Sequence, residues 1–115
     1  AEAYLTYAEA SIRKNGQNTT ATAYINKLRE RANANQESTY TLDDVLDEWS
    51  REFWFEGRRR MDLIRFGRFG GQSEYLWEFM NGIPTGGSFS SNFNVFGLPA
   101  TDLDVNTNLK QNAGY

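Results

Sequence analysis

The residues best suited to bind a charged ligand are concentrated in the segment 51–67, REFWFEGRRRMDLIRFG, which joins three consecutive aromatics to arginines and carboxylates. Aromatics on every side of a helix predict burial, and buried charges have to be paired. Glu56 precedes Arg59 and Arg60 by three and four residues, so a continuous helix would make them neighbours. We therefore expect a buried polar clasp, with a ligand carboxylate or phosphate site as the alternative. If the clasp forms, Glu56→Ala should destabilise the fold by about 3 kcal/mol or more.

A second group of candidate ligand residues follows this segment and combines aromatic rings with amides: Tyr75, Trp77, Phe79, Asn81, Asn92 and Asn94. A pyranose has an apolar C–H face that lies flat on an aromatic ring, and its hydroxyl groups bind amides. Trp77 and Tyr75 are the predicted stacking residues, and Asn81 is the predicted hydroxyl partner. Burial of the same rings in a core is the alternative interpretation.

The sequence offers few residues for catalysis. It contains no histidine and no cysteine, so a Ser-His-Asp relay, a reactive thiol and a transition-metal site all lack their usual parts. Two pairs of carboxylates could be cast as a glycosidase acid and nucleophile, Glu74 with Glu78 and Asp102 with Asp104. Neither pair has an apolar neighbourhood that would raise one pKa. We predict no catalytic residue, no metal site and no cofactor.

Charge and hydropathy exclude further classes of function. The net charge is −3, and the one basic stretch, residues 51–68, also holds Glu52, Glu56 and Asp62, which argues against nucleic-acid binding. The sequence has no apolar run of about 18 residues and no signal peptide. It also opens inside a helical pattern without a capping residue or an initiator methionine, so we expect the C-terminal part of a longer protein.

Two helices are expected at the start of the chain. The first covers residues 1–14, and the second begins after a cap at Thr19 or Thr20. Their apolar stripes consist of Leu5, Ala8 and Ile12 in the first helix and of Tyr24, Ile25, Leu28 and Ala32 in the second. We predict an antiparallel hairpin that resembles a tetratricopeptide unit, with an ordinary helical hairpin as the alternative.

A third helix has the clearest start signal. Thr41 and Asp44 form a capping box, and Tyr40 and Val45 occupy the positions of a hydrophobic staple. Its inward stripe is Leu42, Val45, Leu46, Trp49 and Phe53. Continued to residue 66 it would be about 37 Å long, which exceeds a compact body of this chain length, so we expect a break near Gly57.

The remaining sequence, residues 70–115, is rich in glycine, serine and asparagine and has no sustained period. One short helical turn is expected after Pro99. The predicted fold is thus mostly α: residues 1–69 form a helical scaffold of a tetratricopeptide-like hairpin and a long, broken helix. Residues 70–115 form a loop-rich tail that wraps over the scaffold.

Five segments in this order resemble the C-terminal portion of SusD/RagB family proteins: residues 3–10, 25–32, 41–48, 51–67 and 106–115. The resemblance implies a lipoprotein on the outer face of the Bacteroidetes outer membrane, anchored through a preceding portion. It also implies capture of oligosaccharides and their delivery to a SusC-like TonB-dependent transporter, without enzymatic activity.

Within this interpretation, residues 70–98 are the predicted ligand-facing loop. Two alternatives remain. In the first, residues 1–115 are only a helical protein-interaction scaffold, and any ligand site lies upstream. In the second, the protein is a peptide-binding relative of the glycan-binding members.

Overall fold

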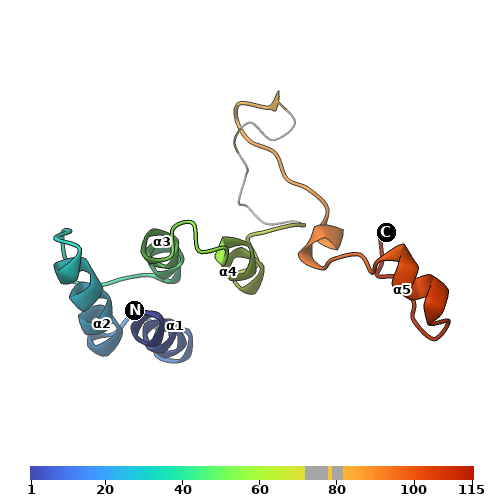
Figure 1. Ribbon diagram of the computed structural model, residues 1–115. Coiled ribbons are helices and arrows are strands. Elements are labelled where there is room, and N and C mark those ends of the chain that lie inside the picture. The colour runs from blue at the N-terminus through green and yellow to red at the C-terminus, as the bar shows by residue number, and fades with distance from the viewer. Residues whose placement is uncertain (72–77, 79–81) are drawn as a thin grey trace. The chain divides into compact units, whose positions relative to one another are not determined.

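The computed structural model of the protein describes residues 1–71, 78 and 82–115, and the chain is mostly helical (Figure 1). The described residues include no β-strand, which confirms the predicted fold class. The helices are α1 (Glu2–Asn15), α2 (Thr19–Arg31), α3 (Leu42–Glu52), α4 (Arg59–Arg65), the 3-10 helix η2 (Ser91–Asn94) and α5 (Ala100–Val105). Residues 1–62 and 63–115 form two compact units. The predicted division into scaffold 1–69 and tail 70–115 stays a prediction.

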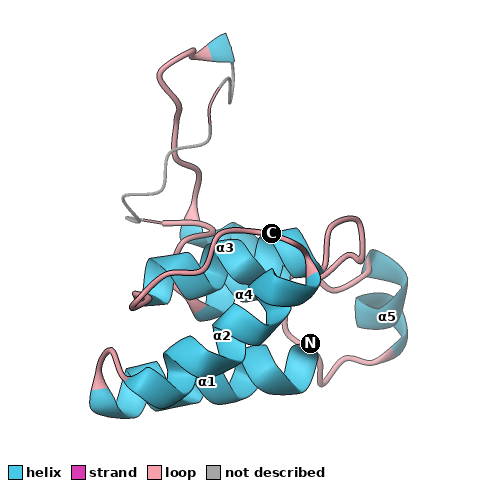
Figure 2. Cartoon of the chain, turned by 90° about the vertical axis from the view of Figure 1, so that its left-hand side faces the viewer, coloured by secondary structure: helices cyan, strands magenta, loops and turns pink. Residues whose placement is uncertain are grey.

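Helices α1 and α2 pack side by side as an antiparallel pair (Figure 2). Each has an apolar stripe at spacings of three and four, which buries Leu5, Ala8 and Ile12 on α1 and Ala21, Ile25 and Leu28 on α2. The connection is short, and Gly16 takes a left-handed φ of 72° that ends α1. Rings of Tyr4 and Tyr7 contact that of Tyr24 at centroid distances of 5.1 and 5.0 Å.

Two details of α2 differ from the prediction. Its N-cap is Asn18 in place of Thr19 or Thr20: the Asn18 side-chain oxygen accepts from the Ala21 amide at 2.9 Å. Ala32 is exposed, because α2 ends at Arg31. The tetratricopeptide-like detail stays a prediction.

Helix α3 begins as predicted. The Thr41 hydroxyl accepts from the Asp44 amide, and the Asp44 carboxylate accepts from the Thr41 backbone N–H, which completes the capping box. The flanking Tyr40 and Val45 are buried, as expected for a hydrophobic staple. Of the predicted stripe, Val45, Leu46 and Trp49 are buried, and Leu42 and Phe53 are half-buried.

Buried carboxylates tie the three helices together. Glu9 on α1 accepts from Trp49 Nε1 of α3 at 2.9 Å. Glu48 on α3 accepts from Nη2 of Arg29 on α2, also at 2.9 Å. Each of these two buried carboxylates has a hydrogen-bond donor on a neighbouring helix. The pairs therefore compensate for the burial of the charge and also fix how the helices pack.

The long helix is broken, as predicted near Gly57. α3 ends at Glu52, and α4 begins only at Arg59. Two left-handed residues lie between them, Phe55 with a φ of 63° and Gly57 with a φ of 77°. Glycine adopts this conformation without strain, whereas a phenylalanine there is a genuine outlier.

In residues 63–115 several side chains bond to backbone groups of the loops. Gln111 accepts from the Leu98 amide at 2.8 Å and donates to the Leu98 carbonyl at 2.9 Å. Asn112 donates to the Phe96 carbonyl at 2.7 Å, and the Tyr115 hydroxyl donates to the Val95 carbonyl at 2.9 Å. Helix α5 follows Pro99, where a short helical turn was predicted.

Candidate functional site

The three predicted ligand residues, Tyr75, Trp77 and Asn81, lie outside the described residues. Their assignment to a glycan site therefore stays a prediction. The nearby amides Asn92 and Asn94 are described, and both are half-buried. The Asn94 Oδ1 accepts from the Gly70 amide at 3.1 Å, so this side chain holds a loop closed.

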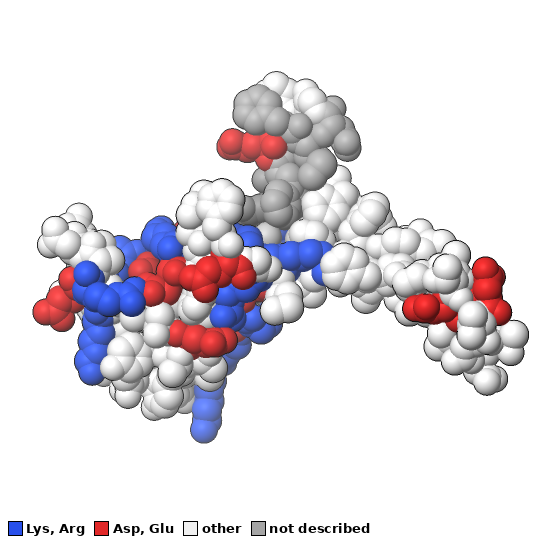
Figure 3. Space-filling view, in the orientation of Figure 1, with Lys and Arg blue, Asp and Glu red and all other residues white. Residues whose placement is uncertain are grey.

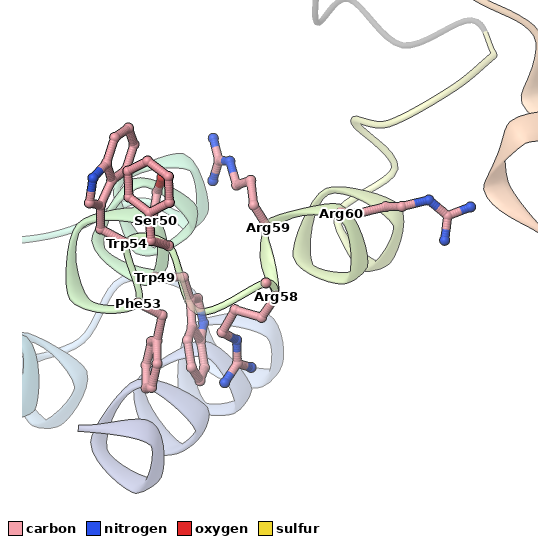
Figure 4. Close-up of a pocket in the computed structure, with 9 residues that line it drawn as sticks. Trp49, Ser50, Phe53, Trp54, Arg58, Arg59 and Arg60 are labelled. Carbon is pink, nitrogen blue, oxygen red and sulfur yellow. The ribbon is translucent and has the colours of Figure 1, made fainter.

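In the part of the chain that the structure describes, a hollow of about 300 Å³ opens where α3 ends and α4 begins. The residues that line it are Trp49, Ser50, Phe53, Trp54, Phe55, Gly57, Arg58, Arg59 and Arg60 (Figure 4). We call it the α3–α4 hollow. It exists because the helix breaks within the segment 53–58, so that the two helix ends and the turn between them enclose a space.

Arg58 and Trp49 form one side of the hollow. The Arg58 guanidinium lies 3.9 Å from the centroid of the Trp49 ring, a cation–π contact. Its Nε donates to Asp62 at 3.1 Å, and its Nη1 donates to Glu2 at 3.0 Å. Asp62 is 1% exposed and Trp49 1%. This side is therefore a buried, neutralised cluster whose contacts are structural.

Trp54 and Phe55 form an exposed edge of the hollow. Trp54 is 71% exposed and Phe55 92%, and their rings meet edge to face at 5.2 Å and 89°. Burial was predicted for both on the assumption of a continuous helix, and that prediction was wrong. The helix ends before them, and the left-handed turn at Phe55 leaves both rings on the surface. Two adjacent, exposed large aromatics are an informative feature of a surface.

The predicted clasp between Glu56 and Arg59 or Arg60 is also wrong. Glu56 is exposed, and among the described residues no ion pair involves it. The break at Gly57 removes the helical spacing that would have made them neighbours. Arg59 instead donates from Nη1 to the Leu46 carbonyl at 2.9 Å. The carboxylate that does form a buried pair in this segment is Asp62, four residues after Arg58. The large destabilisation predicted for Glu56→Ala is therefore no longer expected.

The chemistry of the hollow is that of binding: aromatic faces and guanidinium groups suit apolar surfaces and anions.

No group of three or more acidic, histidine or cysteine side chains among the described residues could hold a metal ion. Asp102, Asp104 and Glu78 are all exposed, and Glu74 lies outside the described residues. None of the described helices is long and apolar enough to cross a membrane.

Comparison with known proteins identifies relatives over the whole chain. Residues 1–115 match the model of the SusD family. The chain is 47% identical over 116 residues to the starch-binding protein SusD of Bacteroides thetaiotaomicron, covering 100% of this chain and 20% of that protein. The fold matches surface glycan-binding protein A from Bacteroides uniformis with a TM-score of 0.80 and 32% identity, over 97% of this chain and 26% of that one.

A SusD superfamily protein from Parabacteroides distasonis matches with a TM-score of 0.74 over 97% of this chain and 25% of that chain. At 23% identity it supports the fold alone. The chain thus spans about a fifth to a quarter of the length of these relatives.

Proposed function

The chain belongs to the SusD family, and from this premise we propose that it is part of a non-enzymatic protein that binds oligosaccharide at the bacterial cell surface. The observation that carries the proposal is the 47% identity to a starch-binding protein across the full length of the chain. The likeness in fold to a surface glycan-binding protein supports it independently.

The proposal extends to a partner and a location. The protein delivers oligosaccharide to a SusC-like TonB-dependent transporter and sits on the outer face of the outer membrane, held by a lipid anchor outside residues 1–115. Membership of the SusD family supports both statements.

Within the chain we assign ligand contact to the segment 70–98. Trp77 and Tyr75 stack on sugar rings, and Asn81 binds a hydroxyl group. What supports this is the chemistry of the residue types, since aromatic rings and amides suit the two faces of a pyranose. Loops are also where binding residues concentrate on a rigid scaffold.

A second candidate function is a helical interaction scaffold whose ligand site lies elsewhere in the protein. One observation favours it for residues 1–62: the buried charged side chains there bond between helices, as Glu9 does with Trp49 and Glu48 with Arg29. The remaining alternative is a peptide-binding rather than a glycan-binding member of the family.

Calorimetry on the full natural polypeptide that carries these residues tests the function and the site separately. We expect maltoheptaose to bind, and Trp77→Ala with Tyr75→Ala to weaken binding about tenfold, equivalent to about 1.4 kcal/mol. Tyr7→Ala, which removes an exposed aromatic outside that segment, is the matched control. Unchanged affinity in the double variant would remove the site assignment. Binding of peptides and of no glycan would contradict the function.

A further inference from the structure

The α3–α4 hollow has the parts of a second carbohydrate site with a distinct ligand class. We propose that it binds a sugar residue that carries a carboxylate, such as a uronic acid, between the Trp54 ring and the Arg59 guanidinium. The proposal rests on the glycan binding proposed above and adds to it a ligand class and a place.

Trp54 provides the stacking surface. It is 71% exposed, and its edge-to-face contact with Phe55 at 5.2 Å sets the two rings at 89°. A corner of two perpendicular rings offers one flat face to the C–H side of a pyranose and a second ring against its edge. The hollow, about 300 Å³, is at the lower end of the roughly 300–1,000 Å³ of ligand sites, which fits one or two sugar residues.

Arg59 provides the carboxylate partner. Its Nη1 is held by the Leu46 carbonyl at 2.9 Å, and Leu46 is buried on α3, so the guanidinium is fixed in position. Its Nε and Nη2 make no hydrogen bond to any residue that the structure describes. These two nitrogens lie on one edge of the guanidinium, the arrangement that binds both oxygens of a carboxylate.

The distribution of charge favours an acidic ligand. None of the described residues that line the hollow is acidic. Arg58 is paired with Asp62 and Glu2, so its charge is compensated inside the protein. Figure 4 shows Arg59 extending toward the side of Trp54, Arg58 toward Trp49, and Arg60 away from both. Arg59 is therefore the arginine placed to act together with the exposed indole.

Nuclear magnetic resonance of the tryptophan indole N–H groups provides the test, on the full natural polypeptide. The chain has three tryptophans, and Trp54→Phe identifies the Trp54 signal. The probe is digalacturonic acid, and galactobiose is its neutral counterpart. We expect the acid to shift the Trp54 signal at a concentration at least tenfold lower than the neutral disaccharide requires.

Charge variants test the role of Arg59. Arg59→Gln should abolish the preference for the acid, whereas Lys14→Gln, which removes one exposed positive charge from the end of α1, should leave it unchanged. Because Arg59 also holds Leu46, thermal melting checks that Arg59→Gln still folds. Trp54→Ala, which truncates an exposed side chain, is the second variant. It has no Trp54 signal, so calorimetry with digalacturonic acid measures its binding, which should be at least tenfold weaker.

Several outcomes would overturn the proposal: no shift of the Trp54 signal, an equal response to both disaccharides, or an Arg59→Gln protein that keeps its preference. A Trp54 indole that is protected from solvent in the full polypeptide would also overturn it, since a protein segment would then cover the hollow. Binding of maltoheptaose without any effect at Trp54 would reject this site while leaving the proposed function standing.

Discussion

Residues 1–62 and residues 63–115 are stabilised in different ways. Of the residues that the structure describes, the first unit contains ten of the eleven buried apolar ones and all three buried carboxylates. Among the described residues of the second unit only Leu63 is buried, and its loops are closed by amide and hydroxyl side chains bonded to backbone groups. In Figure 3 most of the visible charged side chains lie over the helices α1 to α4, and the sequence has seven charged residues after position 62 against 20 in residues 1–62.

This difference means that the first unit depends on its packed core, whereas the second can change more of its residues without losing its structure. A core of packed helices tolerates little change, because each lost contact leaves a cavity or an unpaired charge. A loop region held by a few polar clasps can vary its remaining residues at small cost, which suits a surface that has to match different ligands. The comparison predicts large effects of substitution in the first unit and small, local effects in the second.

The largest effect is expected at Trp49. Trp49→Ala removes a fully buried ring, the donor to Glu9 and the surface under Arg58, and should lower the free energy of unfolding by about 3–5 kcal/mol. Trp54→Ala is the matched control, because Trp54 is exposed, and should change stability by less than about 0.5 kcal/mol. Urea denaturation measures both. If both variants lost a similar amount of unfolding free energy, Trp49 would not differ from Trp54 in burial as the structure shows.

The next effect is expected at Asp62. Asp62→Ala leaves Arg58 without its buried partner and should cost about 3 kcal/mol, reduced to the extent that Glu2 compensates. Glu56→Ala, in the same segment but at an exposed position, should be near neutral. Denaturation of the two variants side by side checks this. A larger loss at Glu56 would restore the clasp that the broken helix excludes.

In the second unit, Gln111→Ala should have a local effect. It removes two hydrogen bonds to Leu98, each contributing about 0.5–1.5 kcal/mol. We expect faster hydrogen exchange of the Leu98 amide with an unchanged main unfolding transition. Lys110→Ala, one residue earlier and exposed, should leave that exchange rate unaltered. A shift of the main transition by Gln111→Ala would show that the two units unfold as one.

These contrasts explain which features were predictable from sequence. The capping box of Thr41 and Asp44 and the burial of Val45, Leu46 and Trp49 on α3 are set by residues a few positions apart, so they were predicted correctly. Asn18 was missed as a cap because three successive residues, Asn18, Thr19 and Thr20, can all cap a helix, although asparagine is the better N-cap. The surface position of Trp54 depended on where α3 ends, and helix ends are less well specified than helix interiors.

The contacts of the second unit could not be predicted from local sequence patterns. Gln111 reaches Leu98 thirteen residues back, and no local pattern marks that pairing. Asn94 was considered as a ligand amide because amides bind hydroxyl groups, yet it closes a loop onto Gly70. The same ambiguity applies to any polar side chain in a loop, where ligand and backbone compete for the same donors and acceptors.

The smallest expected effect is the pH dependence of the α3 cap. Hydrogen bonds from the Thr41 hydroxyl and the Thr41 backbone N–H lower the pKa of Asp44 below its usual value. A group whose pKa is lower in the folded state stabilises the fold above its unfolded pKa, and that contribution is lost as the pH falls through the folded pKa. Asp44→Asn should therefore be less stable than the wild type at pH 7, and the difference should shrink below about pH 4.

Removal of a cap costs about 0.5–2 kcal/mol, and Asp44→Asn retains an acceptor oxygen, so the low end is expected. Urea denaturation at pH 7, 5 and 3 measures the effect, with Asp47→Asn, an exposed carboxylate on the same helix, as the control. A difference that grows as the pH falls would contradict the sign. If the difference in unfolding free energy between Asp44→Asn and the wild type is small and vanishes in acid, the helix ends contribute little to the stability of the first unit. Its buried pairs and apolar core then supply most of that stability.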